Sequence, residues 1–485
     1  MTNRGTFLDG EILIGAELSR KGTAGTMEHR YPATSEVNGT VNLCGASEVN
    51  DAVTSAKAAA RVWQALAPTE RRDRLNRLAD IIAARCEQFR QLAAAEIGQP
   101  RQSFNTRYAW SLNWIRMYAG YADKIGGDVT ATSDAAGTLE YTRLEPYGVV
   151  GIIITWNVAL LSLAMKIPPA LAAGNTVVVK PSELTPYTPI LFGKACLEAG
   201  IPPGVVNIVP GGREAGEALV VHEDVEKISF TGGVATAMAM MRSGAAMLKP
   251  FCFELGGKSA QLVFADADIE TAAALSAASL SNAGQSCVFG SRILVHDSIY
   301  PKFQAALLGA MQKVIVGDPQ SAATQMGPLV TAQARDRVLS IIDKAVSERQ
   351  GSLVLGGKAP RLQGELNAGY FVEPTLVSDV DPASPLAREE IFGPVYLLTR
   401  FSEENQAIEA ANATRFGLSN FVYTRDLKRA VRVTSLLKSG TVYVNDASRQ
   451  NAAAPFGGYR LSGIGYEGGR AGLDEYLRRK TVGLA

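Results

Sequence analysis

Apolar positions along the chain follow two different periods. Between residues 48 and 99 they recur every three to four positions with charged residues between them, which is typical of amphipathic helices. We expect one helix to start after Ser47 and a second to run over 68–94. From residue 149 the pattern changes, because short runs of β-branched residues, such as 149–154 and 176–180, alternate with helical segments. Strands and helices that alternate at this spacing form a parallel sheet with helices on both faces.

Two such alternating series follow each other, and the break between them falls at Gly256-Gly257. The sequence therefore predicts two α/β layers. The first comprises strands 149–154, 176–180, 205–209 and 227–230 and helices 161–173, 186–200 and 216–222. The second comprises strands 260–264 and 291–296 and helices 269–282 and 298–316, and the segments 331–348, 352–355, 396–401, 405–414 and 441–445 extend it.

One uncharged stretch, residues 148–165, has the borderline length of a membrane span. Trp156-Asn157 interrupts it, and Lys166 follows directly, so we expect a buried strand, a loop and the start of a helix instead. The first residues lack the basic region and long apolar run of a secretory signal. The sequence therefore predicts a cytoplasmic protein without a membrane partner.

Composition narrows the function further. The 485 residues carry 48 basic and 47 acidic side chains, a net charge of +1, which argues against a nucleic-acid partner. The five cysteines have no CxxC spacing and the three histidines lie far apart, so neither a disulfide framework nor a metal site is predicted. Glycine, at 47 residues, exceeds its usual share of about 7%, which indicates places where the backbone approaches a ligand.

Three residues are candidates for chemistry because of their positions. Asn157 follows an expected strand, and ligand sites of α/β proteins form past such strand ends. Glu254 follows the apolar run 251–253, a setting that would disfavour its charged form and prepare it as a base. Cys287 follows a glycine at 284, where the backbone can approach a reacting carbonyl. Taken singly, each has an ordinary alternative: a turn asparagine, a solvated glutamate and a small buried hydrophobe.

Together these residues resemble the motifs of NAD(P)-dependent aldehyde dehydrogenases of the hydrolytic, non-acylating type. The resemblance covers nearly the whole chain, and it is specific because many motifs occur in the family's order. They are Trp156-Asn157, Lys180-Pro-Ser-Glu183, Phe230-Thr-Gly232, Glu254-Leu-Gly-Gly-Lys258, Gly284-Gln-Ser-Cys287, Glu390-Ile-Phe-Gly-Pro394 and Pro455-Phe-Gly-Gly-Tyr459.

The resemblance implies the oxidation of an aldehyde to its carboxylic acid. Cys287 would form a thiohemiacetal and then a thioester, Asn157 would donate to the oxyanion, and Glu254 would activate the hydrolytic water. It implies NAD as cofactor, with NADP as the alternative, and the carboxylate of Glu183 favours NAD because it would repel a 2′-phosphate. The residues that would hold the cofactor are Trp156, Lys180, Ser182, Glu183, Phe230, Thr231, Gly232, Gly233, Leu255, Glu390 and Phe392.

By family position, the aldehyde tunnel would be lined by Val158, Met165, Ser286, Val288 and Gln450. Several of these positions are aromatic in relatives that take small aliphatic aldehydes, so the smaller residues here predict a roomier tunnel for a bulky or aromatic aldehyde. An acidic semialdehyde is the alternative substrate; no arginine is clearly placed for its carboxylate, and Arg292 and Arg449 stay open as candidates. A CoA-acylating relative is disfavoured by the presence of Glu254, and a non-catalytic protein of the same fold is a remote alternative.

The resemblance also implies an α/β fold with two Rossmann-like parallel-sheet domains and a small β element for bridging and oligomerisation. Residues 1–123 and 147–254 would form the NAD-binding domain, 255–445 the catalytic domain, and 124–146 with 446–485 the bridging element. In that element a hairpin over 126–145 would pair with a strand near 480–485. Its exposed edge would be unpaired in a monomer, so a homodimer or homotetramer is expected.

Overall fold

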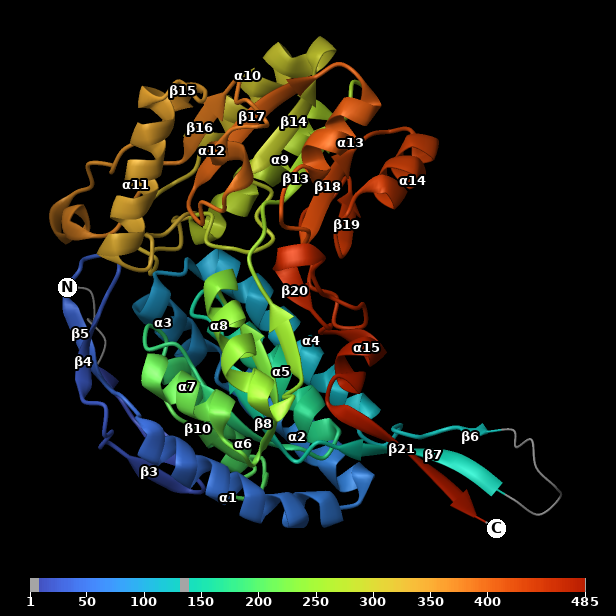
Figure 1. Cartoon of the computed structure of the whole chain (residues 1–485). Coiled ribbons are helices and arrows are strands. Elements are labelled where there is room, and N and C mark those ends of the chain that lie inside the picture. Colours follow the sequence, from blue (N-terminus) through green and yellow to red (C-terminus); the bar gives the residue numbers. More distant parts are fainter. Residues whose placement is uncertain (1–7, 131–138, 485) are drawn as a thin grey trace.

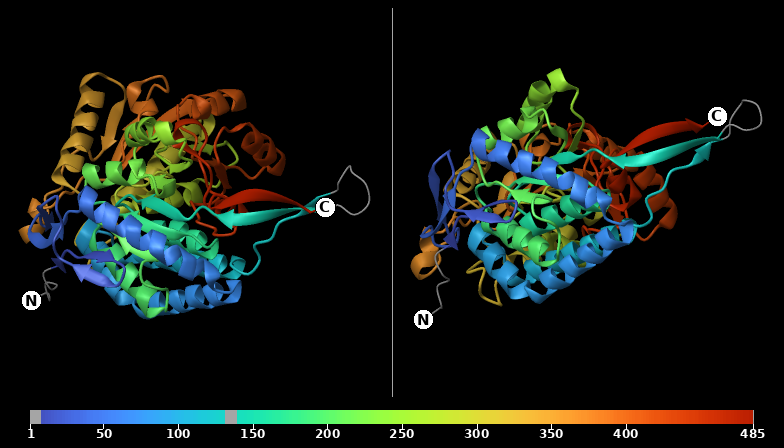
Figure 2. Two further views of the ribbon diagram at one scale, coloured as in Figure 1. Left: turned by 60° about the horizontal axis from the view of Figure 1, so that its bottom comes forward. Right: turned by 90° about the horizontal axis from the view of Figure 1, so that it is seen from below.

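The computed structural model describes residues 8–130 and 139–484. Two lobes, each with a β-sheet between layers of helices, lie one above the other, and a narrow β-ribbon projects from the lower lobe (Figure 1). Two further views show that this ribbon stands clear of both lobes (Figure 2). The fold is mixed α/β with parallel sheets, as the alternating pattern predicts.

Eight strands form the sheet of the first lobe. They are β2 (Ile12–Ile14), β3 (Glu17–Ser19), β8 (Val149–Ile153), β9 (Thr176–Lys180), β10 (Val206–Ile208), β11 (Val225–Thr231), β12 (Phe251–Glu254) and β20 (Gly463–Ile464). Their order is β20-β12-β11-β8-β9-β10-β2-β3. Strands β8 to β12 run parallel, and the order reverses at β8, with β9 and β10 on one side and β11 and β12 on the other. Such a reversal opens a crevice at the carboxyl ends of the strands.

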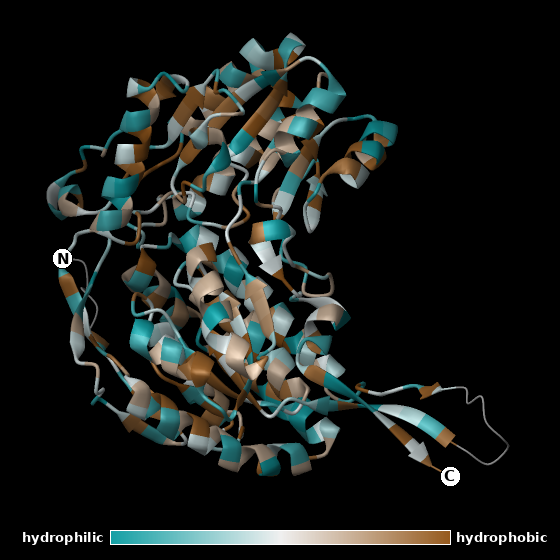
Figure 3. Cartoon of the chain, in the orientation of Figure 1, coloured by the Kyte–Doolittle hydropathy of each residue, from teal (hydrophilic) through white to brown (hydrophobic). Residues whose placement is uncertain are grey.

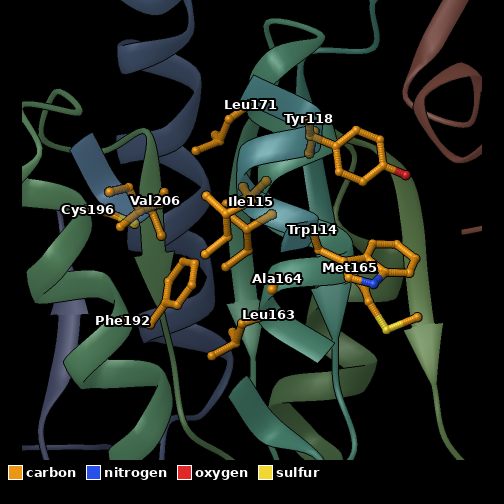
Figure 4. Close-up of a cluster of buried hydrophobic side chains, with 14 of the residues drawn as sticks. Trp114, Ile115, Tyr118, Leu163, Ala164, Met165, Leu171, Phe192, Cys196 and Val206 are labelled. Carbon is orange, nitrogen blue, oxygen red and sulfur yellow. The ribbon is translucent and has the colours of Figure 1, made fainter. Parts of the chain in front are cut away.

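Helices cover both faces of this sheet. They are α1 (Ala46–Ala65), α2 (Pro68–Ala84), α3 (Cys86–Ile97), α4 (Arg101–Tyr121), α5 (Ala159–Ala172), α6 (Tyr187–Glu198), α7 (Arg213–Val221) and α8 (Val234–Gly244). Val178 packs in the core beneath α1 and α7, whereas Val177 and Val179 face the core beneath α5 and α6. Successive side chains of a strand point to opposite faces, so a run of valines serves both cores. Figure 4 shows part of the second core, where Trp114 lies beside Met165.

The helix expected over 68–94 is in fact two helices, so that prediction is wrong. Helix α2 ends at Ala84, Arg85 leaves the helical backbone with φ −105° and ψ 21°, and α3 begins at Cys86. No glycine or proline marks the break. At the break, Arg85 pairs with Glu198 of α6.

The sheet of the second lobe has seven strands in the order β15-β16-β17-β14-β13-β18-β19. They are β13 (Ala260–Val263), β14 (Arg292–His296), β15 (Ser352–Leu355), β16 (Thr375–Ser378), β17 (Val395–Phe401), β18 (Ser419–Tyr423) and β19 (Thr441–Val444), and all but the edge strand β15 are parallel to their neighbours. The helices are α9 (Ile269–Ala278), α10 (Tyr300–Gln312), α11 (Ala332–Ser347), α12 (Pro385–Arg388), α13 (Glu404–Asn412) and α14 (Leu427–Leu436). Two apolar clusters fill the two faces, one with Val263 and Ile293 and the other with Leu262 and Leu294.

The ribbon joins distant parts of the chain. Strand β21 (Leu477–Leu484) pairs antiparallel with β7 (Leu139–Pro146), and β6 (Val129–Thr130) pairs with the other edge of β7. The tip of the expected hairpin, 131–138, lies outside the described residues. A small sheet near the N-terminus contains β1 (Leu8–Asp9), β5 (Val37–Asn42) and β4 (Thr26–Arg30), and the short helix α15 (Gly469–Asp474) precedes β21.

Hydropathy follows this architecture. The central strands of both sheets are largely apolar, whereas polar residues dominate the outer faces of the helices (Figure 3). In the described part of the chain, no helix is both long enough and apolar enough to span a membrane.

Candidate active site

The candidate site lies where opposite ends of the two sheets meet. Glu254 ends β12 at the carboxyl edge of the first sheet, and a short loop then crosses to β13 at the amino edge of the second sheet. Cys287 precedes β14, and Glu390 precedes β17, so both also lie at amino ends of second-sheet strands. The first sheet therefore contributes residues that follow its strands, and the second contributes residues that precede its own.

Two glycines make the crossing loop compact. A β-carbon on Gly257 would collide with the carbonyl oxygen of Cys287, and one on Gly256 would collide with the carboxylate of Glu390. The backbone N–H of Gly257 donates to Glu390 Oε1 at 3.0 Å. Glycine is required here because only a bare backbone brings the two lobes this close.

Asn157 stands in the loop after β8 with its amide held in one orientation. Its Nδ2 donates to the carbonyl oxygen of Gln285 at 3.0 Å, and Asn282 Nδ2 donates to the same carbonyl at 2.9 Å. A side-chain amide has two N–H groups, so one remains for another acceptor. The contact also ties the loop after β8 to the segment that carries Cys287.

Cys287 is half-buried. The backbone N–H groups of Cys287 and Val288 lower the pKa of its thiol, but burial dominates, and the nearby Glu254 and Glu390 act in the same direction as burial. The net effect raises the pKa of Cys287 to about 12. The sulfur is therefore a thiol at neutral pH in this state, and a reaction must remove its proton.

Glu254 is buried, and neither of its carboxylate oxygens has a hydrogen-bond partner. Phe251 and Phe253 stack beside it at a centroid distance of 4.9 Å, in keeping with the apolar run in the sequence. Burial raises the pKa of Glu254 well above its ordinary value; Glu467 adds to this rise and Lys166 opposes it. A carboxyl group with a raised pKa is suited to accept a proton near neutral pH.

The expected cofactor residues cluster at the carboxyl ends of β8, β9, β11 and β12 in the first sheet, and before β17 in the second. Lys180 ends β9; its Nζ donates to the Gly211 carbonyl at 2.5 Å and lies 3.9 Å from Glu183 Oε2. Ser182, Glu183, Thr231 and Gly232 are half-buried, Phe230 and Leu255 are buried, and Gly233 is the exposed residue before α8. Phe392, with φ 53°, lies edge-on to Trp156 at a centroid distance of 5.6 Å.

The expected tunnel residues are partly brought together. Val158, Val288 and Cys287 pack against the same apolar cluster, and Ser286 is half-buried next to Cys287. Met165 lies on α5 beside Trp114 and is largely buried (Figure 4). Gln450 is half-buried in the loop that follows β19. The tunnel assignment of these five residues stays a prediction.

The two arginines left open by the sequence are already bound elsewhere. Arg292 donates to the carbonyl oxygens of Lys258, Ala410 and Ala411, at 2.9, 2.8 and 2.8 Å. Arg449 has 71% of its side chain exposed and pairs with Asp446 at 2.6 Å. The guanidinium of Arg292 is therefore engaged by backbone carbonyl oxygens, whereas Arg449 is held at the surface by its pairing with Asp446.

Sequence reasoning missed three charged residues near the site. Lys166 on α5 is fully buried, pairs with the buried Glu467 and donates to Ser229 Oγ at 2.9 Å. Arg107 on α4 lines a small cavity together with Trp156 and Val158, the two neighbours of Asn157 in sequence. The available signal was a lone charge among apolar residues, as at Lys166 within α5, but the sequence does not show which partner such a charge meets.

Comparisons with known proteins identify the family of this chain. The model of the aldehyde dehydrogenase family matches residues 19–482, and the chain therefore belongs to that family. It is 39% identical over 461 residues to the mitochondrial succinate-semialdehyde dehydrogenase of Arabidopsis thaliana, covering 95% of this chain and 86% of the relative. It is 39% identical over 456 residues to the betaine aldehyde dehydrogenase of Bacillus subtilis, covering 93% and 92%.

Solved structures agree. The crystal structure of PnpE from Pseudomonas sp. WBC-3 superposes with a TM-score of 0.95 at 38% identity, covering 98% of both chains. PnpE has also been solved in complex with nicotinamide adenine dinucleotide, and that structure superposes equally well, with a TM-score of 0.95. Among the described residues of this chain, no group of three or more histidine, cysteine, aspartate or glutamate side chains is arranged to hold a metal ion.

Proposed function

We propose that this protein oxidises an aldehyde to its carboxylic acid with NAD, using Cys287 as nucleophile, Asn157 as oxyanion donor and Glu254 as general base. The observation that carries the proposal is their assembly at one junction between the sheets. Asn157 is bonded to the segment before Cys287, and Glu254 is near enough to influence the pKa of the Cys287 thiol. Membership of the aldehyde dehydrogenase family supports the same reaction.

The residues present fit a dinucleotide. A β-carbon on Gly233, the residue before α8, would meet no atom within 4 Å, so there is room beside the start of this helix, and the N-terminus of a helix suits a diphosphate. Lys180 and Glu183 would hold the adenosine ribose with Ser182, and Glu390 with Phe392 would hold the nicotinamide ribose and ring. When bound, NAD supplies the hydride acceptor of the reaction.

Residues of the chain itself carry out the other steps of the reaction. As Cys287 forms the bond to the aldehyde carbon, its thiol gives up the S–H proton to solvent, and the resulting oxyanion accepts hydrogen bonds from the free amide N–H of Asn157 and the backbone N–H of Cys287. Oxidation leaves an acyl group on the sulfur as a thioester. Glu254 accepts a proton from the water that attacks this thioester, which releases the carboxylic acid and restores the thiol.

We expect NAD to be preferred over NADP. The carboxylate of Glu183 is 40% exposed and stands 3.9 Å from Lys180 Nζ, where it accepts a hydrogen bond from a ribose 2′-hydroxyl and repels a 2′-phosphate. The ratio of kcat/KM for the two cofactors measures this directly, and a ratio in favour of NADP contradicts the assignment of Glu183.

The choice of hydrolysis over transfer to CoA follows from the base. Glu254 is present, buried and without a partner, so it is available to activate water.

For the substrate, the small side chains of Val158, Ser286 and Val288 support a roomy tunnel for a bulky aldehyde. The relatives carry names for both semialdehyde and betaine aldehyde substrates, so their names alone do not select one.

The proposal also covers the cellular compartment, the oligomeric state and the domain boundaries of the protein. Five free cysteines support a reducing cytoplasm. The projecting ribbon has an exposed strand edge, which supports a homodimer or homotetramer in which another copy covers that edge. The two separate sheets support domain boundaries at 1–123 with 147–254 and at 255–445, and the ribbon supports a bridging element from 124–146 and 446–485.

The experiment measures the reduction of NAD to NADH by absorbance, with aliphatic, aromatic and acidic aldehydes as substrates. Cys287→Ala removes the nucleophile, and we expect it to lower kcat by at least about 10⁴-fold. Cys86→Ala, at another half-buried cysteine, is the matched control and should keep its activity. Full activity in Cys287→Ala, or product that forms only with CoA, overturns the proposed mechanism.

A further inference from the structure

Arg107 differs from the other arginines near the site because its charge has no partner. It lies on α4, which packs along α5, and the residue is half-buried. Its Nη1 is sealed from solvent and makes no hydrogen bond, and within residues 8–130 and 139–484 no carboxylate lies within ion-pair distance of its guanidinium. Burying a guanidinium without a partner costs free energy, so proteins ordinarily pair such groups.

The position of Arg107 links it to the reacting centre. Its side chain lines a small cavity of about 20 Å³ together with Trp156 and Val158, the two neighbours of Asn157. Burial lowers the pKa of Arg107 to about 10, and Cys287 opposes this shift. With a pKa of about 10 the guanidinium remains positively charged at neutral pH.

The described part of the chain supplies no counter-charge for Arg107. Glu96 is the acid among the described residues that line this cavity, but its carboxylate already accepts hydrogen bonds from the backbone N–H groups of Tyr187 and Thr188, at 2.7 and 3.1 Å, and from Thr188 Oγ1 at 2.5 Å. A cavity of about 20 Å³ has room for roughly one water molecule. A water offers an acceptor for one N–H group but no negative charge.

Exposure indicates where the missing anion comes from. Arg107, Val158, Cys287 and Val288 are all half-buried, unlike the sealed core around them, so each borders accessible space. Val158 lines the cavity together with Arg107 and packs against the same apolar cluster as Cys287 and Val288, so a ligand that reaches the sulfur of Cys287 passes close to the Arg107 guanidinium. The planar fork of a guanidinium binds a carboxylate through two parallel hydrogen bonds.

We propose that Arg107 binds a carboxylate on the substrate, and that the protein's substrates are aldehydes that carry an acidic group away from the reacting carbonyl. This inference rests on the proposed function and specifies its substrate class. The same charge disfavours a cationic aldehyde in the tunnel. Substrate preference then depends on charge as well as on tunnel size, because a neutral aldehyde of the same bulk leaves Arg107 unpaired.

The test uses aldehydes of matched size and different charge: 4-carboxybenzaldehyde, 4-methylbenzaldehyde and 4-(trimethylammonio)benzaldehyde, and the aliphatic pair 4-oxobutanoate and butanal. We expect the wild-type enzyme to have its highest kcat/KM for the anionic member of at least one series and its lowest for the cation. Arg107→Met should reduce kcat/KM for that anion roughly 10- to 100-fold, chiefly through KM, while the neutral aldehyde changes less than about threefold. The kcat/KM of Arg107→Lys for the anionic aldehyde should lie between the values of the wild type and of Arg107→Met. Arg116→Met, at an exposed arginine of the same helix paired with Asp80, is the matched control and should change neither.

Two further readouts separate substrate binding from a structural role. A structural arginine would lower Tm when replaced, whereas Arg107→Met removes an unpaired buried charge and should keep or raise Tm. In Cys287→Ala, which does not turn over, terephthalate should raise Tm more than 4-methylbenzoate does, and this difference should vanish when Arg107→Met is added. Equal effects of Arg107→Met on anionic and neutral aldehydes, or no difference between the two acids, overturn the proposal. If no aldehyde is oxidised at all, the proposed function fails, while the Tm experiment still decides the role of Arg107.

Discussion

Two buried glutamates beneath the site show how equal burial leads to different roles. Glu254 and Glu467 each have 3% of their surface exposed. Glu467 pairs with Lys166, which also donates to Ser229 Oγ, so its charge is compensated. Glu254 has no partner at either oxygen, and burial raises its pKa. The difference teaches that burial alone does not mark a functional acid; burial without a partner does, because the protein bears the cost of a group that it does not use to hold itself together.

The largest expected effect is on the unpaired member. Glu254→Gln keeps the shape of the side chain but cannot accept a proton, so kcat should fall by about 10²- to 10⁴-fold while Tm stays unchanged. Because Cys287 still reacts, a rapid burst of about one NADH per active site should precede the slow steady state. Stopped-flow absorbance and a thermal melt measure both. A large loss of Tm without loss of kcat would assign Glu254 the structural role and break the comparison.

The paired member should behave in the opposite way. Lys166→Met leaves Glu467 buried without its cation, so we expect the free energy of unfolding to fall by about 3–5 kcal/mol. Arg213→Met is the control, because the Arg213–Glu217 pair is 88% and 54% exposed and should contribute less than about 0.5 kcal/mol. Denaturant titration of both variants gives the two values. If Lys166→Met costs no more than the control, Glu467 is not compensated in the way that the contacts indicate.

The smallest effect is a pH dependence. Since the folded-state pKa of Glu254 is raised, its carboxyl is protonated and inactive as a base over a range where an ordinary glutamate is ionised. Thioester hydrolysis should therefore slow about tenfold per pH unit as the pH falls below this raised pKa. Single-turnover measurements of acid release give the profile. Glu254→Gln should lose this limb, and a wild-type profile that is flat down to the ordinary glutamate pKa contradicts the raised value.

Much of the fold and of the site was predictable because the signals are contiguous in sequence. The β-branched run that becomes β8 places Asn157 at a strand end, and the apolar run before Glu254 predicts its burial. The break at Arg85 was not predictable, because no glycine or proline in the sequence marks it. The state of Arg107 was not predictable either, since the absence of a partner depends on every element that packs around it.

Pairing across long distances sets a second limit on sequence reasoning. Lys166 and Glu467 lie 301 positions apart, and no periodicity along the chain relates them. Likewise β20, only two residues long, completes the edge of the first sheet beside β12, yet it follows the whole second lobe in sequence. Such contacts arise from topology and cannot be derived from a local pattern.

The late position of Glu467 has a consequence for biosynthesis. A ribosome releases the chain from its N-terminus, so α5 with Lys166 emerges long before the carboxylate that compensates it. Until then the first lobe either keeps this lysine in water, and so leaves its interior open, or buries an unpaired charge. The first lobe can therefore become fully stable only after Glu467 has left the ribosome, and a nascent chain that stalls after the second lobe presents chaperones and proteases with an incompletely closed core.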